Sequence, residues 1–126
     1  MKLRIKGNSL RLRLTRPEVA RLSAGEAVEE STEFAPDQVL IYKIRPAEGT
    51  DDIRASFGSG VAEVTVAPDR VRQWAASDET GIYVLAGALD IAIEKDFRCL
   101  TRPEERFNAD VYPHPGDEER GSGAGR

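Results

Sequence analysis

Basic side chains alternate with apolar ones through the first two extended runs of the sequence. The apolar positions are Leu3 and Ile5, then Leu10, Leu12 and Leu14. Successive side chains of a strand point to opposite faces, so the residues between them should share the other face. Those residues are the cations Lys2, Arg4, Lys6, Arg11 and Arg13. Such a face can bind phosphate groups or carboxylates. The competing interpretation is an ordinary solvated face that pairs with nearby acids.

A second candidate site involves Lys43 and Lys95. Each continues the alternation of two apolar residues, Val39 and Ile41 in one run and Ile91 and Ile93 in the other. If those faces point inward, the two lysines lie at the mouth of the core and coordinate an anion. The competing interpretation is that their stems cover apolar surface while the ammonium groups reach water.

Nucleophilic and metal chemistry find little support. The chain has one cysteine, Cys99, and one histidine, His114, and the histidine lies in a proline-rich stretch. A nucleophile and its base must be held within hydrogen-bond reach, so we expect no such dyad. No loop has the spacing of a calcium site. We therefore predict no catalytic residue, no metal site and no cofactor.

Turn and capping signals place these residues on short elements. Gly7-Asn8-Ser9 predicts a hairpin between the runs at 2–6 and 9–14. Thr15 and Glu18 have the spacing of a capping box, so a short helix should follow and end near Gly25. Strands are predicted at 27–34 and 39–45. The pattern then restarts, with strands at 53–57 and 61–66, a helix that begins at 67–69, and strands at 82–86 and 89–95.

The two halves match at a constant offset of about 52 residues, which predicts a duplicated β-β-α-β-β unit. The expected fold class is α+β, mostly antiparallel, with about eight strands and two short helices in a barrel or two packed sheets. We expect one globular domain over residues 1–100, with repeats at 2–46 and 53–98. The tail at 101–126 should be disordered at least from residue 117, although the segment 107–115 could lie extended across the domain surface.

Charge is unevenly distributed along the 126 residues, although the net charge is only −4. Residues 1–21 hold seven basic side chains against one acid, and residues 22–37 hold five acids and no base. No aromatic residue is interleaved with the cations, so nucleic-acid binding is not expected. We find no membrane span or signal peptide, and the lone cysteine agrees with a reducing compartment, so a cytoplasmic protein is predicted.

Three stretches carry a resemblance to a known family. They are the opening residues 1–15, the run Ile93-Glu94-Lys95-Asp96-Phe97-Arg98-Cys99 and the ending Tyr112-Pro113-His114-Pro115. The chain resembles, up to about Pro115, a family of small bacterial proteins of unknown function. That resemblance implies no activity, ligand or catalytic residue.

The combined interpretation is a non-catalytic binding domain, with a homodimer expected. Its partner is predicted to be an acidic protein or another anionic, phosphate-bearing ligand, and no membrane. The predicted binding residues are Arg4, Lys6, Arg11, Arg13, Lys43 and Lys95. The alternative is a small enzyme acting on a phosphorylated or carboxylated small molecule in a barrel mouth, where Glu94 and Asp96 would join the two lysines.

Overall fold

A strand–strand–helix–strand–strand order occurs twice along the chain. The computed structural model describes residues 1–49 and 52–97, and Met1–Asp96 form one compact unit. Our predictions for Cys99, His114, the segment 107–115 and the tail at 101–126 lie outside the described residues. The elements are β1 (Lys2–Lys6), β2 (Ser9–Leu14), α1 (Arg16–Ser23), β3 (Val28–Ala35), β4 (Gln38–Pro46), β5 (Ile53–Gly58), β6 (Val61–Val66), α2 (Pro68–Ala75), β7 (Gly81–Ala86) and β8 (Leu89–Lys95).

The two helices begin differently. Thr15 is the N-cap of α1 in a capping box, and its backbone N–H donates to the Glu18 carboxylate at 2.9 Å. The N-cap of α2 is Ala67, which has no side-chain oxygen to accept from the first turn. Both helices have a proline in the first turn, where the missing N–H costs no hydrogen bond. Each helix is eight residues long, so packing rather than propensity must stabilise it.

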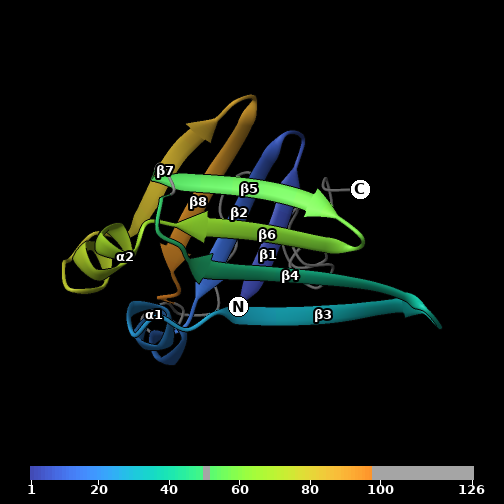
Figure 1. The fold of residues 1–126 in the computed structure, drawn as a ribbon, viewed down its shortest axis with the longest axis horizontal. Helices are drawn as coiled ribbons and strands as arrows, with labels where there is room; N and C mark the ends of the chain where they lie inside the picture. Colours follow the sequence, from blue (N-terminus) through green and yellow to red (C-terminus); the bar gives the residue numbers. More distant parts are fainter. Residues whose placement is uncertain (50–51, 98–126) are drawn as a thin grey trace, which may run out of the picture. The chain divides into compact units, whose positions relative to one another are not determined.

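The strands form two four-stranded sheets rather than a closed barrel (Figure 1). The first sheet has the order β1-β2-β8-β7 and the second has the order β3-β4-β6-β5. In each sheet the hairpins are antiparallel, while the central pairs, β2 with β8 and β4 with β6, are parallel. Each sheet therefore combines a hairpin from one half of the chain with a hairpin from the other. The predicted α+β class with two packed sheets is confirmed.

One continuous apolar core joins the two sheets and the helices. The two sheets contribute buried branched side chains such as Leu12, Ile93, Ile44 and Val64. The helices contact each other and add the remaining buried residues, Val19, Leu22, Val71 and Trp74. Because these side chains fill the interior, the faces of the sheets that point away from the core are the ones open to ligands.

The constant offset of 52 is wrong for the second hairpin of each half. It holds for the first hairpins, where Leu3 pairs with Leu12 and Ala55 pairs with Val64. In the second hairpins, the buried pairs are Val28 with Ile44 and Ile82 with Ile93. These pairs span 16 and 11 positions, so β3–β4 is the longer hairpin.

The same registers correct the predicted faces of β4. Ile44 is the fully buried residue of this strand, so Lys43 and Ile41 lie on the opposite face from the core. Val39-Leu40-Ile41-Tyr42 is apolar at four consecutive positions. Without alternation, periodicity could not tell which face of β4 is buried.

Candidate anion-binding face

Five cations share the outer face of the first sheet, which we call the basic face: Lys2, Arg4, Lys6, Arg11 and Arg13. Residues directly opposite each other in an antiparallel pair share a face. Lys2 lies opposite Arg13, Arg4 lies opposite Arg11, and Lys6 lies opposite Ser9. Like charges directly opposite each other destabilise a sheet. The hairpin β1–β2 therefore holds two repulsive pairs that an anion would relieve.

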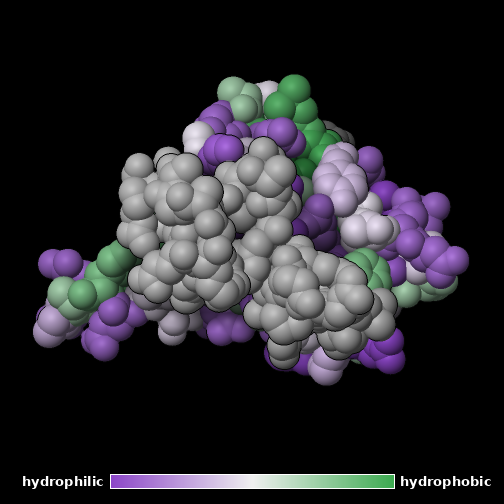
Figure 2. Space-filling model, turned by 180° about the vertical axis from the view of Figure 1, so that it is seen from behind, coloured by the Kyte–Doolittle hydropathy of each residue, from purple (hydrophilic) through white to green (hydrophobic). Residues whose placement is uncertain are grey.

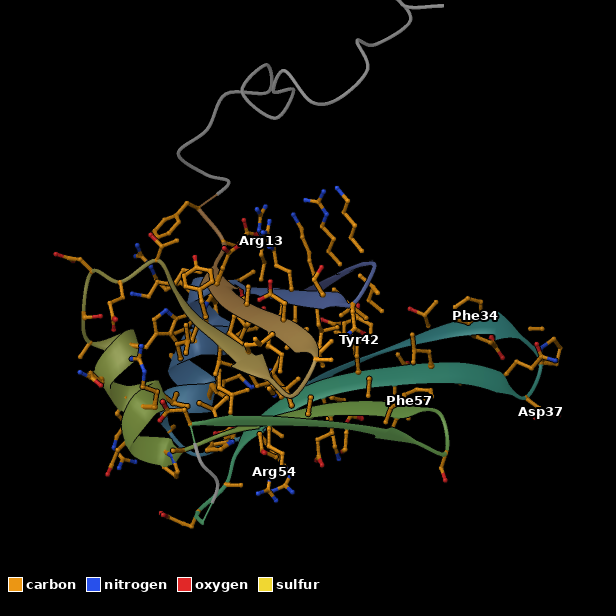
Figure 3. The ribbon with its side chains drawn as sticks, turned by 90° about the horizontal axis from the view of Figure 1, so that it is seen from above. Arg13, Phe34, Asp37, Tyr42, Arg54 and Phe57 are labelled. Atoms are coloured by element: carbon orange, nitrogen blue, oxygen red, sulfur yellow. The ribbon has the colours of Figure 1, made fainter. Side chains whose placement is uncertain are left out.

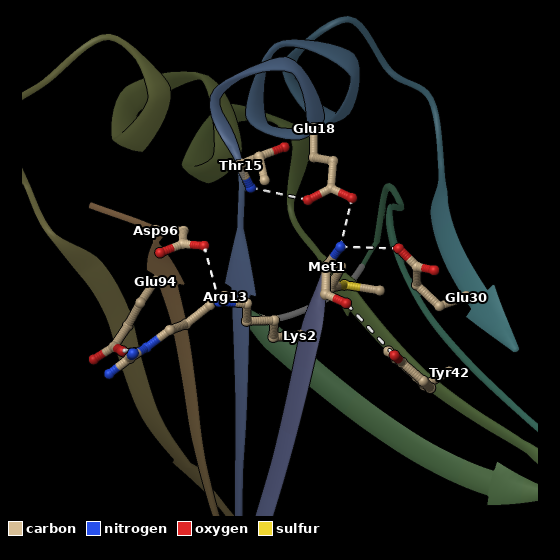
Figure 4. A network of polar contacts seen from close by, with 9 residues as sticks. All are labelled: Met1, Lys2, Arg13, Thr15, Glu18, Glu30, Tyr42, Glu94 and Asp96. Carbon is tan, nitrogen blue, oxygen red and sulfur yellow. Dashed lines mark hydrogen bonds and ion pairs between the residues drawn. The ribbon is translucent and has the colours of Figure 1, made fainter. Parts of the chain in front are cut away.

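Two acids of the chain neutralise one end of the basic face. The Glu94 carboxylate accepts from Arg13 Nε at 3.2 Å and lies 3.6 Å from Arg11 Nε. Lys2 Nζ lies 3.6 Å from Asp96 Oδ2 (Figure 4). Within residues 1–49 and 52–97, Arg4 and Lys6 have no ion pair, and both are exposed. Asp90 is a third acid on this face, two strands away from Lys6 in the row Lys6–Ser9–Asp90. Five cations therefore face three acids, and the two cations without an ion pair lie toward the turn of β1–β2.

Tyr83 and Gly81 complete this end of the face, and sequence reasoning did not single them out. The Tyr83 hydroxyl donates to Glu94 Oε2 at 2.8 Å. Partial desolvation of the hydroxyl, followed by this hydrogen bond, raises the pKa of Tyr83. A Cβ at Gly81 would lie 2.9 Å from the Tyr83 hydroxyl and 2.6 Å from the Ile93 carbonyl oxygen. The absence of a side chain at Gly81 thus makes room for the tyrosine. The sequence feature that could have pointed to this contact is the glycine at the start of β7.

The outer face of the second sheet has its charges compensated. Glu63 Oε2 lies 2.6 Å from Arg45 Nε and 3.6 Å from Lys43 Nζ. The hydrogen bond from Arg45 is the main cause that lowers the pKa of Glu63. An open hollow of about 280 Å³ lies on this side, and its charged lining residues are Arg45, Arg54, Glu48 and Glu63. Two arginines and two glutamates give it no charge surplus.

The structure does not bring Lys43 and Lys95 together. Lys43 lies in the second sheet beside Glu63, whereas Lys95 lies in the first sheet on the face that carries Ile91 and Ile93. Lys95 Nζ donates to the Ser77 carbonyl at 2.7 Å and lies 5.7 Å from the centroid of the Trp74 ring. The Lys95 ammonium group therefore interacts favourably with the dipole at the carboxyl end of α2 and makes a cation–π contact with the buried Trp74 ring.

Arg13 and Arg54 show the separation of the two outer faces. In Figure 3 they point away from each other, one from each sheet, with Tyr42 between the sheets. Four of the predicted binding residues therefore lie together on the basic face, namely Arg4, Lys6, Arg11 and Arg13. Lys43 and Lys95 are not part of this face. In the described part of the chain, no group of three or more His, Cys, Asp or Glu side chains could hold a metal ion.

A polar network anchors the start of β1 between the sheets (Figure 4). The Met1 ammonium lies 2.6 Å from Glu18 Oε2 and 2.9 Å from Glu30 Oε2. The Tyr42 hydroxyl donates to the Met1 carbonyl at 3.5 Å. Burial opposes both charges, yet the hydrogen bonds between them prevail, so the pKa of Met1 is raised and that of Glu18 is lowered. The network fixes the edge of the basic face.

Comparison with known proteins gives a family but no activity. A family of unknown function (DUF7009) matches residues 1–116, and the chain belongs to this family. No curated protein matches, and no solved structure matches. None of the helices described is both long enough and apolar enough to cross a membrane.

Proposed function

We propose that this protein is a non-catalytic binding module that holds an anionic partner on its basic face. The observation that carries the proposal is the pair of like-charged cross-strand neighbours on an open sheet surface, Lys2 opposite Arg13 and Arg4 opposite Arg11. Glu94 and Asp96 neutralise only part of that charge. Arg4 and Lys6 are left to bind carboxylates or phosphate oxygens through charge-assisted hydrogen bonds.

The alternative, an enzyme with a site in a barrel mouth, has less support. Its four residues were to be Lys43, Lys95, Glu94 and Asp96. Lys43 pairs with Glu63 in one sheet, and Lys95 pairs with the end of α2 in the other. Glu94 and Asp96 are engaged with cations of the basic face. The space between the sheets is occupied by core side chains.

Several further proposals accompany the binding function. We propose that the protein acts in the cytoplasm of a bacterium, as the predicted reducing environment and the resemblance suggest. We also propose that the two halves arose by duplication. The matching helix bounds support this, since α1 at Arg16–Ser23 and α2 at Pro68–Ala75 lie 52 positions apart.

The binding proposal is tested with the triple variant Arg4→Ser, Arg11→Ser, Arg13→Ser. A matched control, Arg16→Ser, Arg54→Ser, Arg72→Ser, removes the same charge away from the basic face. Two fluorescent probes separate the ligand sources: a glutamate-rich peptide containing one phenylalanine, and inorganic polyphosphate. Anisotropy should show binding weakened about tenfold or more in the face variant and almost unchanged in the control.

The salt dependence provides a second measurement. Binding should weaken strongly between about 50 mM and about 500 mM salt, because exposed charges are screened. Equal affinity in the face variant and the unaltered chain would refute the proposal, and so would an equal loss in the control. Binding of polyphosphate alone would identify a phosphate-bearing ligand as the partner.

A further inference from the structure

The basic face has an apolar margin on β7. Leu85 and Tyr83 are 69% and 58% exposed, and they share the outer face with the cations through the cross-strand rows Arg4–Arg11–Ala92–Tyr83 and Lys6–Ser9–Asp90–Leu85. Four strands span about 14 Å from the basic margin to the apolar one. A ligand that covers this surface should therefore combine negative charge with at least one large apolar group.

The tip of the β3–β4 hairpin has that combination; we call it the acidic tip and define it as Glu33, Phe34 and Asp37. Phe34 is 71% exposed and lies where the register shifts between Glu33 and Ala35. A bulge of this kind re-aims a side chain. Among the described residues, Glu33 and Asp37 have no ion pair. Figure 2 shows, at the left, hydrophilic and hydrophobic side chains together on this projecting end.

The turn accounts for Asp37, because aspartate is among the residues that tolerate a left-handed conformation, but it accounts for neither Glu33 nor Phe34. Asp37 has a φ of 65°, a left-handed conformation that glycine adopts at lower cost. The corresponding turn of β7–β8 has Gly87 with a φ of 64°. The β3–β4 hairpin is also longer than β7–β8, by about 8 Å on each arm. The first half thus extends a hairpin beyond what its counterpart needs and places a carboxylate at its end.

We propose that the acidic tip of one copy docks on the basic face of a second copy of this chain. This inference rests on the proposed function and names its partner. In Figure 3 the tip, with Phe34 and Asp37, projects sideways from the sheets, away from the side that carries Arg13. The tip therefore fits a neighbouring molecule rather than its own basic face.

The docked arrangement pairs the two cations of the basic face that have no ion pair among the described residues with the acids of the tip. Glu33 and Asp37 meet Arg4 and Lys6, and Phe34 covers the apolar margin at Leu85. Each copy has one tip and one face, so the contact either closes as a ring, of which the two-fold dimer is the smallest, or repeats along an open chain. Both assemblies use the same contact and lose it through the same substitutions.

The test is complementation between two variants. The charge-reversed variant of the basic face, Arg4→Glu, Lys6→Glu, changes only cations without ion pairs in the described residues. The tip variant Phe34→Ser, Asp37→Gly keeps a residue suited to the positive φ. Sedimentation velocity should show self-association of the unaltered chain at about 100 μM and low salt, weakened at least tenfold in each variant. An equimolar mixture of the two variants should form a 1:1 complex through the intact face and the intact tip.

Matched controls are Arg54→Glu on the second sheet and Asp78→Asn after α2, and both should associate like the unaltered chain. A monomeric unaltered chain would overturn the inference, and so would variants that associate normally or a mixture that does not form the complex. The two proposals fail differently. If the chain is monomeric but the glutamate-rich peptide still requires Arg4, the partner is another acidic protein. If the peptide and polyphosphate are also not bound, the proposed function fails as well.

Discussion

The two halves of the chain share one order of elements but few identical residues, and their structural differences separate stability from binding. Both halves have matching first hairpins and helices of equal length. The core positions of the helices also agree, with Leu22 and Trp74 buried at the same place. The first half adds a capping box at the start of its helix, cations on β1–β2 and a longer second hairpin. The shared positions therefore build the scaffold, and the unmatched ones carry the charge.

The largest effect is expected at the core position where the halves differ in size. Trp74 is completely buried, so Trp74→Ala should lower the free energy of unfolding by about 3–5 kcal/mol. Leu22→Ala should cost somewhat less, since a smaller side chain is removed. Urea denaturation measures both, with Phe57→Ala as an exposed control. A Trp74→Ala cost as small as that of Phe57→Ala would contradict the proposed common core.

A smaller effect is expected from filling the space at Gly81. A Cβ there meets the Ile93 carbonyl oxygen, so Gly81→Ala should cost about 1–3 kcal/mol. Gly58→Ala in β5 is the control, because a Cβ at Gly58 meets nothing within 4 Å. Displacing the Tyr83 hydroxyl from Glu94 should also lower the pKa of Tyr83 toward its ordinary value, measured by ultraviolet titration against Tyr83→Phe. An unchanged titration would show that the hydrogen bond survives.

The ion pair between Met1 and Glu18 at the start of α1 predicts a pH dependence of stability. The Glu18 pKa is lowered, so its contribution is present above the unfolded pKa near 4.5 and is lost as the pH falls through the folded pKa. The Met1 pKa is raised from 8.0, so its contribution is lost as the pH rises through that higher value. Glu18→Gln should lower the free energy of unfolding by on the order of 1 kcal/mol at neutral pH. It should also weaken the dependence of stability on pH at both the acidic and the basic end.

Urea denaturation from about pH 3 to about pH 10 measures the free energy of unfolding at each pH. Glu48→Gln is the control, because it removes an exposed acid. Equal pH profiles for Glu18→Gln and the control would show that the Met1–Glu18 pair contributes nothing.

The smallest effect should come from giving α2 the cap that it lacks. Ala67→Ser supplies a side-chain oxygen to the first turn and should raise the free energy of unfolding by about 0.5–1 kcal/mol. Ala76→Ser at the other end of α2 is the control and should gain nothing. Thermal denaturation measures both. A loss of stability in Ala67→Ser would mean that the half-buried site cannot accept the hydroxyl group.

Local patterns in the sequence predicted the elements well and their partners poorly. Alternation and capping placed β6 at Val61–Val66 and the N-cap at Thr15, because these signals act within a few residues. The pairing of β2 with β8 has no local signal, since parallel partners are chosen by packing across the whole chain. The same limit applies to Lys43, whose face depends on which side of an apolar strand meets the core.

For the basic face, alternation in the sequence identified the cations but not which of them lie directly opposite each other on neighbouring strands. Lys2 and Arg13 were predicted to share a surface, yet only the hairpin register shows that they lie directly opposite each other. Glu94 was noted as a carboxylate, and its contact with Arg13 depends on a pairing between residues 81 positions apart. The roles proposed for Tyr83 and Phe34 depend on which strands pair in the sheets, and local sequence patterns do not predict that pairing.

The exchange of hairpins between the sheets also constrains how the chain folds. β2 cannot gain its parallel neighbour until β8 has been synthesised, so the first sheet closes only when both ends of the domain meet. Such non-local contacts slow folding, and we expect the β2–β8 pairing to be the late step. A cut in the connection between Pro46 and Ile53 would leave two fragments, each with half of both sheets. Neither fragment should fold alone, and mixing them should restore the fold.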